Sequence, residues 1–275
     1  WLACTDYSQG KVVLIAADGH IAWETPSPSC NDLWVMPNGN LLFNTGRGVR
    51  EVTRAGTTVF EYASDSEVYA CQRLANGNTF VGECNSGRLL ELAPDLKVVN
   101  EVRLLPAGTD GGHAYIRNAR RLPNGNALVA HYGTEVVREY DPTGKIVWEV
   151  KAPGGPHSVA RLPNGNTLIA TGDMHQDPRL IEAGPDGATV WDVSNADLEG
   201  KPLYFLTGFQ RLPNGNTLIS NWLGHGNLGK APHLLEITPD KKIVWTYANH
   251  KDLRTISSVV VLNAEGNPEK DATIH

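Results

Sequence analysis

The chain has 275 residues, 41% of them hydrophobic, and a formal net charge of −6. This composition is that of a globular protein, and no apolar run approaches the roughly 18 residues that a membrane-spanning helix needs. The acidic balance, with no dense run of lysine or arginine, argues against a protein that grips nucleic acid through its phosphates.

The N-terminal stretch, residues 1–25, predicts three β-strands separated by short turns. Because the first residue already lies in a predicted strand, we expect that a leader preceded it and was removed. Four cysteines fall in the first third of the chain, at positions 4, 30, 71 and 84, and no Cys-x-x-Cys spacing occurs. A zinc knuckle is therefore not expected, whereas disulfides and buried thiols both stay open.

From about Cys30 to Tyr247 one short motif recurs. Its five clear copies start at Met36, Leu74, Leu122, Leu162 and Leu212, and a weaker sixth spans 262–267. Each copy places Asn-Gly between two alternating apolar stretches, which predicts a hairpin with a two-residue turn. Two further predicted strands follow in each repeat, and the last often ends in Val-Trp-Glu or a close variant. Four strands per unit at this period predict the blade of a β-propeller.

We therefore predict an all-β, six-bladed β-propeller with four-stranded antiparallel blades, whose strands run A to D from the axis outward. Blades 1 to 5 are contiguous in the chain. The sixth combines residues 255–262, as strand A, with residues 1–25, so that the two ends of the chain close the ring and leave no open sheet edge. The single domain would span residues 1–262, and residues 263–275 would form a C-terminal tail.

Residues that repeat from blade to blade are expected to build the scaffold. The strand-D tryptophans and Phe60 should pack between blades. An arginine four residues before each turn glycine should pair with a strand-D acid; the arginines are Arg73, Arg121, Arg161 and Arg211, and the acids Glu61, Glu101, Glu149 and Asp192.

Function is expected where the repeats differ. The Asn-Gly turns define one end of the ring, the bottom, so the D-to-A and B-to-C connections meet at the top, where lengths vary. Candidate ligand-binding residues there are Glu83, His113, Asn221, Trp222, His225, Asp32, Asp173 and His175, and candidate catalytic residues are His131, His157 and Arg117; Tyr69 and Tyr132 fall in the same segments.

A two-residue turn would also set the strand register. It places Thr45 opposite Asp32, Glu83 opposite Ala70, His131 opposite Asn118, Thr171 opposite Ser158 and Asn221 opposite Gly208, with Thr5 opposite Ser258 in the closing blade. These polar residues would ring the upper mouth of the channel. Glu83, His131, His157 and Asn221 would then offer two nitrogens and two oxygens to a divalent ion, with a wet polar channel wall as the alternative.

The Leu-Pro-Asn-Gly-Asn turns and the stretch Thr143–Glu149 resemble bacterial PQQ-like propeller repeats and arylsulfotransferase-like six-bladed propellers over nearly the whole chain. The second resemblance implies histidines and an arginine at the channel mouth. A further similarity, to six-bladed lactonases and lyases, implies an acid and an asparagine around a divalent ion. PQQ itself is not expected, because the quinone enzymes have eight blades and adjacent cysteines.

These observations favour a periplasmic, secreted or cell-surface propeller that binds a small polar ligand derived from a carbohydrate at the top of its channel. The first alternative is an enzyme at the same place, either a metal-assisted hydrolase or lyase or a histidine-dependent transferase. His131 and His157 would then exchange protons and Arg117 would stabilise negative charge. The second alternative is a platform that binds a protein partner through its top loops. No nucleic acid partner and no membrane span are expected.

Overall fold

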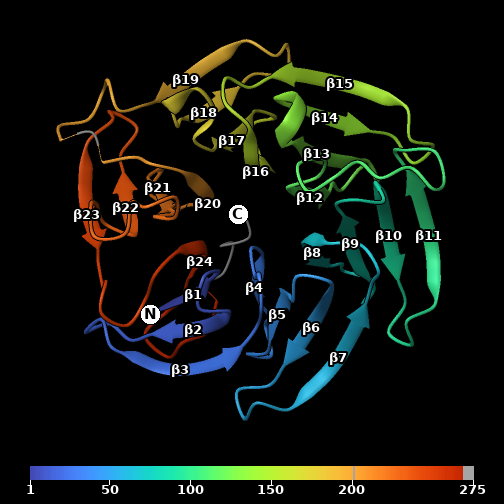
Figure 1. Cartoon of the computed structure of the whole chain (residues 1–275), viewed down its shortest axis with the longest axis horizontal. Coiled ribbons are helices and arrows are strands. Elements are labelled where there is room, and N and C mark those ends of the chain that lie inside the picture. The colour runs from blue at the N-terminus through green and yellow to red at the C-terminus, as the bar shows by residue number, and fades with distance from the viewer. Residues whose placement is uncertain (201, 269–275) are drawn as a thin grey trace.

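Six four-stranded antiparallel sheets surround a central axis in the computed structural model, which describes residues 1–200 and 202–268 (Figure 1). The only helices among these residues are two 3-10 turns, η1 (Tyr132–Thr134) and η2 (Met174–Gln176). The predicted all-β, six-bladed propeller is therefore confirmed.

In each blade the innermost strand comes first. Blade 1 contains β4 (Leu33–Val35), β5 (Leu41–Asn44), β6 (Gly48–Val52) and β7 (Thr58–Ala63). Blade 2 contains β8 (Val68–Arg73), β9 (Thr79–Glu83), β10 (Arg88–Leu92) and β11 (Val98–Arg103). Blade 3 contains β12 (Asn118–Arg121), β13 (Ala127–His131), β14 (Val136–Tyr140) and β15 (Ile146–Lys151).

Blade 4 contains β16 (Pro156–Arg161), β17 (Thr167–Thr171), β18 (Leu180–Ala183) and β19 (Thr189–Val193). Blade 5 contains β20 (Leu206–Arg211), β21 (Thr217–Asn221), β22 (Leu234–Ile237) and β23 (Ile243–Tyr247). Blade 6 contains β24 (Ile256–Val261), β1 (Leu2–Asp6), β2 (Lys11–Ile15) and β3 (Ile21–Pro26).

Both ends of the chain build blade 6. Strand β24, red in Figure 1, lies beside the blue β1, and the pairing sets Thr5 opposite Ser258 as predicted. Beyond β24, a turn spans residues 263–267, and an isolated bridge joins Leu262 to Pro268. The rest of the predicted tail, residues 269–275, lies outside the described residues. Closure gives every innermost strand a neighbouring blade on each side, which is what holds the axis open at a fixed width.

The repeated turn is one residue longer than predicted. In blade 5 the Gly215 amide donates to the Leu212 carbonyl, and the Leu212 amide donates to the Asn216 carbonyl. The loop is thus Pro213-Asn214-Gly215, a turn followed by a glycine with φ of +87°. Proline fixes φ near −65°, so it suits the first position of this turn. The same loop forms at Ala75-Asn76-Gly77, so the proline favours the turn and is not required for it.

The longer turn shifts the strand register by one residue. The observed partners are Ala70↔Gly82, Asn118↔Ala130, Ser158↔Ala170 and Gly208↔Ser220. The predicted pairings of these strand-A residues with Glu83, His131, Thr171 and Asn221 are therefore wrong, and so is that of Asp32 with Thr45, since the Asp32 carbonyl bonds the Asn44 amide. Because neighbouring residues on a strand point to opposite faces, this shift removes the physical basis for the polar ring at the channel mouth.

Three of the four repeated arginines pair with a strand-C acid of the preceding blade, while within the described chain the Arg121 guanidinium bonds only the Gly125 carbonyl of its own turn. Arg161 Nη2 donates to Glu139 Oε2 at 2.7 Å, and Asn126 Nδ2 donates to Glu139 Oε1 at 2.6 Å. The predicted pairing with the strand-D acid Glu149 is wrong, since Glu149 accepts from Arg138 at 2.6 Å within its own blade. The last asparagine of the turn and the arginine therefore join two blades through one carboxylate.

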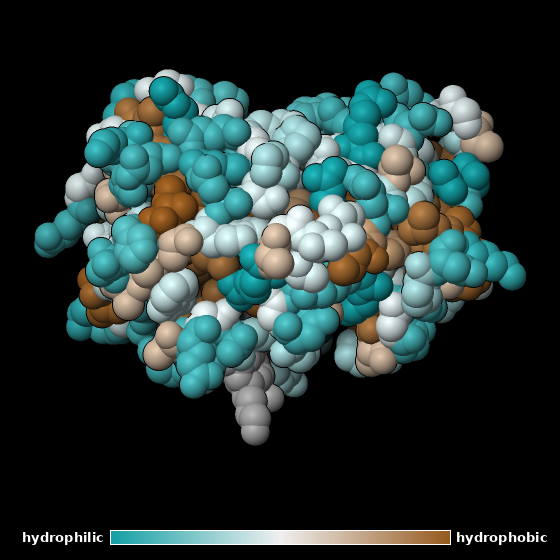
Figure 2. Space-filling view, turned by 90° about the horizontal axis from the view of Figure 1, so that it is seen from below, coloured by the Kyte–Doolittle hydropathy of each residue, from teal (hydrophilic) through white to brown (hydrophobic). Residues whose placement is uncertain are grey.

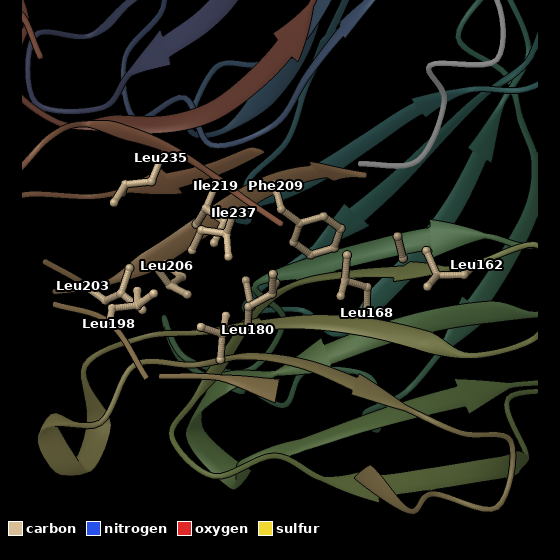
Figure 3. Packing of buried hydrophobic residues seen from close by; sticks show 13 residues of the cluster. Leu162, Leu168, Leu180, Leu198, Leu203, Leu206, Phe209, Ile219, Leu235 and Ile237 are labelled. Atoms are coloured by element: carbon tan, nitrogen blue, oxygen red, sulfur yellow. The ribbon is translucent and has the colours of Figure 1, made fainter. Parts of the chain in front are cut away.

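Apolar side chains fill the spaces between blades. Figure 3 shows one such cluster, in which Leu168 and Leu180 of blade 4 pack with Phe209 and Ile219 of blade 5. The strand-D aromatics contribute as predicted in four blades: Trp23, Trp148 and Trp191 are partly buried against these clusters, and Phe60 is buried within one. Trp245 is the exception at 40% exposed. The burial of these apolar side chains is the main source of stability in such a scaffold.

All four cysteines are buried and free. Desolvation raises the pKa of the Cys4, Cys30, Cys71 and Cys84 thiols above their ordinary value, so they are held as uncharged thiols. The side of the ring in Figure 2 is mostly hydrophilic, with small separated hydrophobic patches. Within residues 1–200 and 202–268 no helix has the length and apolar character needed to cross a bilayer.

Candidate axial binding cup

A cavity of about 460 Å³ opens at the axis, at the end of the ring away from the Asn-Gly turns. We call it the axial cup. All six blades contribute to it, from Tyr7 of blade 6 and Asn31 of blade 1 round to Trp222 of blade 5. Its lining residues lie in the D-to-A and B-to-C connections or at the first residues of innermost strands. The cup therefore lies at the end where the sequence predicted variable, functional segments.

Arg117 is the cationic group of the cup. Its guanidinium lies over the rings of Tyr69 at 4.6 Å and Tyr132 at 5.3 Å. Aromatic faces attract a cation but do not neutralise it. Within the described part of the chain no carboxylate forms an ion pair with Arg117, and its buried Nε has no hydrogen-bond partner. The cup thus presents a positive charge whose hydrogen-bonding capacity is only partly used.

His157 lies beside this charge and stays neutral. Burial, followed by the nearby Arg117 charge, lowers the pKa of its imidazole to about 3. Nδ1 lies 3.1 Å from the Thr207 carbonyl oxygen, so in the neutral ring it is the nitrogen that carries the hydrogen. Nε2 is then left with its lone pair. His157 therefore offers the cup a hydrogen-bond acceptor and no second positive charge.

Aromatic rings form one wall of the cup. Tyr132 and Phe205 stack with centroids 6.0 Å apart, and Trp222 meets Phe205 edge-on at 5.3 Å. Two glycines leave room for this wall. A Cβ on Gly155 would lie 2.5 Å from the Tyr132 ring, and one on Gly172 would lie 2.6 Å from Phe205. The glycine before Pro156 is thus explained by packing of the wall.

Two histidine–carboxylate pairs lie at the rim. His113 Nδ1 lies 2.7 Å from Glu67 Oε2, and His225 Nδ1 lies 2.7 Å from Asp173 Oδ2. Both imidazoles line the cup and are more than half exposed. Asp173 thus reaches the site through His225. A third pair, His175 with Glu135, does not line the cup.

Three predicted site residues are held in the scaffold. Glu83 accepts hydrogen bonds from Tyr62, Ser64 and Ser86, at 2.6 to 2.8 Å. Asn221 bonds the Tyr204 amide at 2.9 Å and the Pro202 carbonyl at 2.7 Å, which fixes the connection into blade 5. Neither side chain lines the cup.

Asp32 is the third and lies in a buried ion pair with Arg120. Nη1 and Nη2 each donate to one carboxylate oxygen at 2.8 Å, and the side chains are 2% and 7% exposed, respectively. Asp32 also accepts the Cys71 amide at 2.9 Å. It therefore joins blades 1, 2 and 3 and does not face a ligand.

His131 is likewise a core residue. Nδ1 lies 2.9 Å from the Tyr115 carbonyl oxygen, and Nε2 lies 2.8 Å from the Tyr140 hydroxyl. With both nitrogens bonded and the side chain absent from the cup lining, His131 is not placed to exchange protons with a ligand. The predicted metal set of Glu83, His131, His157 and Asn221 does not come together, and among residues 1–200 and 202–268 no group of three or more histidine, cysteine or acidic side chains is placed to hold a metal. We derive no chemistry through a metal.

The buried His131 gives a pH-dependent stability. Desolvation lowers its pKa to about 4 in the folded protein, against an ordinary 6.5. The unfolded chain therefore binds this proton more tightly, and stability that is complete above pH 6.5 is lost as the pH falls through 4. We expect the free energy of unfolding, measured in urea, to decline over this interval. In His131→Gln the decline should be shallower, and an unchanged slope would contradict this assignment.

Several cup residues were not among the predicted site residues. Tyr7, Asn31, Phe205 and Thr207 line the cup, and Tyr69 and Tyr132, recognised only as top-segment residues, flank Arg117. Their common signal is position: each lies within a few residues of the upper end of an innermost or second strand. The sequence-based candidates included the aromatic Trp222 and the neutral polar Asn221, but not these four cup residues.

Comparison with protein-family models and with curated proteins finds no match. Among solved structures, the chain is 29% identical to a protein of unknown function from Bacteroides caccae, with a TM-score of 0.84 over 94% of this chain and 97% of that one. It is also similar to a streptogramin B lyase, at 17% identity and a TM-score of 0.62 over 90% of this chain and 79% of the lyase. A virginiamycin B lyase from Staphylococcus aureus gives 16% identity and a TM-score of 0.61, over 90% of this chain and 80% of that one.

At these identities the likeness to the two lyases concerns the fold alone. It supports the six-bladed propeller, while the PQQ-like and arylsulfotransferase-like resemblances of the repeat are not confirmed. The site must therefore be interpreted from its own residues.

Proposed function

We propose that the axial cup binds a small anionic ligand that contains a sugar ring, such as a uronic acid. The observation that carries the proposal is Arg117, a cation at the axis with no carboxylate partner in the described chain. An arginine in such a place is suited to a carboxylate, which it holds through two parallel hydrogen bonds. The carbohydrate-derived ligand expected from the sequence is thus proposed to carry a negative charge.

The remaining cup residues fit the ring of such a ligand. The aromatic side chains that line the cup suit contact with the apolar side of a sugar ring, and the neutral His157 suits acceptance from a hydroxyl. The volume of about 460 Å³ lies within the range of about 300–1,000 Å³ that is usual for small-molecule sites. The cup therefore combines the positive charge of Arg117, aromatic lining residues and the hydrogen-bond acceptor of His157.

Catalysis by histidine has less support than binding. A group with a pKa of about 3, as His157 has, is a weak base at neutral pH and is not protonated to act as an acid. His131 is bonded within blade 3 and does not reach the cup. We therefore propose a binding protein and derive no reaction step.

A protein-binding platform has less support as well. Such a platform needs an exposed apolar patch on the top loops. The large apolar side chains exposed above 40% among the described residues lie on the outermost strands, apart from Leu96 in a bottom turn. An extracytoplasmic location is part of the proposal and rests on the sequence alone; fractionation of the native cells tests it.

The function is tested by calorimetric titration with matched acidic and neutral sugars. Glucuronate and galacturonate should bind, and glucose and galactose should bind about tenfold more weakly or worse, because they lack the charge that Arg117 recognises. The uronate affinity should fall as salt is raised. Equal affinities for acid and neutral sugar, or no binding of either uronate, would overturn the proposal.

A further inference from the structure

A second cavity adjoins the axial cup. It has a volume of about 340 Å³, and we call it the side pocket. Tyr7 and Tyr69 line both cavities, and Glu67, which lines the side pocket, bonds His113, which lines the cup. The boundary between the two spaces is therefore formed by two aromatic side chains and one ion pair. A ligand that occupies both spaces would have to pass over these side chains.

The chemistry of the side pocket differs from that of the cup. Arg47 donates from Nη1 to the Asp65 carbonyl oxygen at 2.6 Å and has no carboxylate partner in the described chain. Glu67 supplies an opposite charge, with Oε2 already held by His113. Thr45 and Ser29 add two hydroxyl groups. The pocket thus combines donors and acceptors with nearly balanced charge.

Balanced donors and acceptors are suited to a neutral sugar. Each sugar hydroxyl both donates and accepts, so it can bond a guanidinium and a carboxylate at once. A second carboxylate on the ligand would meet repulsion from Glu67 as well as attraction from Arg47, whereas no acidic side chain of the described residues lines the cup around Arg117. Of the two aromatic boundary residues, Tyr7 is partly exposed and can contact the sugar, whereas Tyr69 is buried with the Arg117 guanidinium over its ring.

We propose that the ligand is an acidic disaccharide, with its uronic acid in the axial cup and a neutral sugar in the side pocket. This inference rests on the proposed function and extends it. Arg117 then supplies recognition of the charge, and the side pocket supplies selectivity for length and for a neutral second unit.

The test compares three kinds of probe by calorimetry. They are glucuronic acid, glucuronosyl-glucose disaccharides with β-1,3, β-1,4 and β-1,6 linkages, and digalacturonic acid. At least one glucuronosyl-glucose should bind about fivefold or more tightly than glucuronic acid, because it adds hydrogen bonds in the side pocket. Digalacturonic acid should show no such gain, because of Glu67.

Two variants locate the effect. Arg47→Met, at an exposed position, should remove the gain of the disaccharide and leave the affinity for glucuronic acid unchanged. Arg50 is partly exposed and pairs with Glu61 on the outer part of blade 1, so Arg50→Met should change neither affinity. If glucuronic acid binds but no linkage gives a gain, or if the gain survives Arg47→Met, this inference is wrong and the proposed function stands. If neither glucuronic acid nor any disaccharide binds, the proposed function fails with it.

Discussion

Replacing Arg117 with methionine is expected to weaken uronate binding on the order of 10- to 100-fold. The guanidinium between Tyr69 and Tyr132 is the cup's cation without a carboxylate partner in the described chain, so its removal leaves a ligand carboxylate with no charged donor. Methionine keeps a long side chain that can still pack against the two rings. Calorimetric titration with glucuronate measures the change.

Two companion variants make this result specific. Arg117→Lys keeps the charge but loses the two-pronged geometry, so its affinity should lie between those of the parent and Arg117→Met. Arg50→Met removes an arginine of the outer part of blade 1 and should leave the affinity unchanged. Wild-type affinity in Arg117→Met, with the fold intact by circular dichroism, would show that the ligand is recognised elsewhere.

Replacing Asp32 with alanine is expected to lower the free energy of unfolding by about 3–5 kcal/mol. The change leaves the buried Arg120 guanidinium without its carboxylate and removes the acceptor of the Cys71 amide. Three blades meet at this buried carboxylate near the axis, so solvent does not compensate Arg120 for its loss. Urea unfolding followed by tryptophan fluorescence measures the loss.

The matched control for this prediction is Asp177→Ala. Asp177 pairs with Arg179 at the surface, where its side chain is 45% exposed, so its removal should cost about 1 kcal/mol or less. Equal effects of the two substitutions would contradict the scaffold role assigned to Asp32. That result would return Asp32 to the list of candidate ligand contacts.

The architecture was predictable because the same pattern of strands and turns recurs in each repeat. Alternating apolar stretches, Asn-Gly turns and a matching fourth strand recur often enough to give blade number and ring closure. The register was not, because the turn takes in the residue before Asn-Gly, whether that residue is proline as at Pro213 or alanine as at Ala75. The arginine partners were misassigned for a related reason: Arg161 reaches a neighbouring blade, which spacing within one repeat does not reveal.

The position of the cavity was predictable, and its lining residues were predictable only in part. Variable loops gave the correct end of the ring for the cavity and included Arg117, His113, His157, Trp222 and His225. Sequence spacing does not show which polar residues satisfy their hydrogen bonds elsewhere. Tyr62 and Ser64, which bond Glu83, come from the preceding blade and its connection to β8, and Tyr140, which bonds His131, lies on the adjacent strand.

The most direct test of the central claim is a crystal structure of the protein with glucuronate at saturating concentration. The claim predicts the carboxylate on the Arg117 guanidinium, with the sugar ring inside the cup in contact with His157 and with the aromatic side chains that line it. A cup without ligand while the uronate occupies another surface, or a uronate in the cup whose carboxylate points away from Arg117, would contradict it.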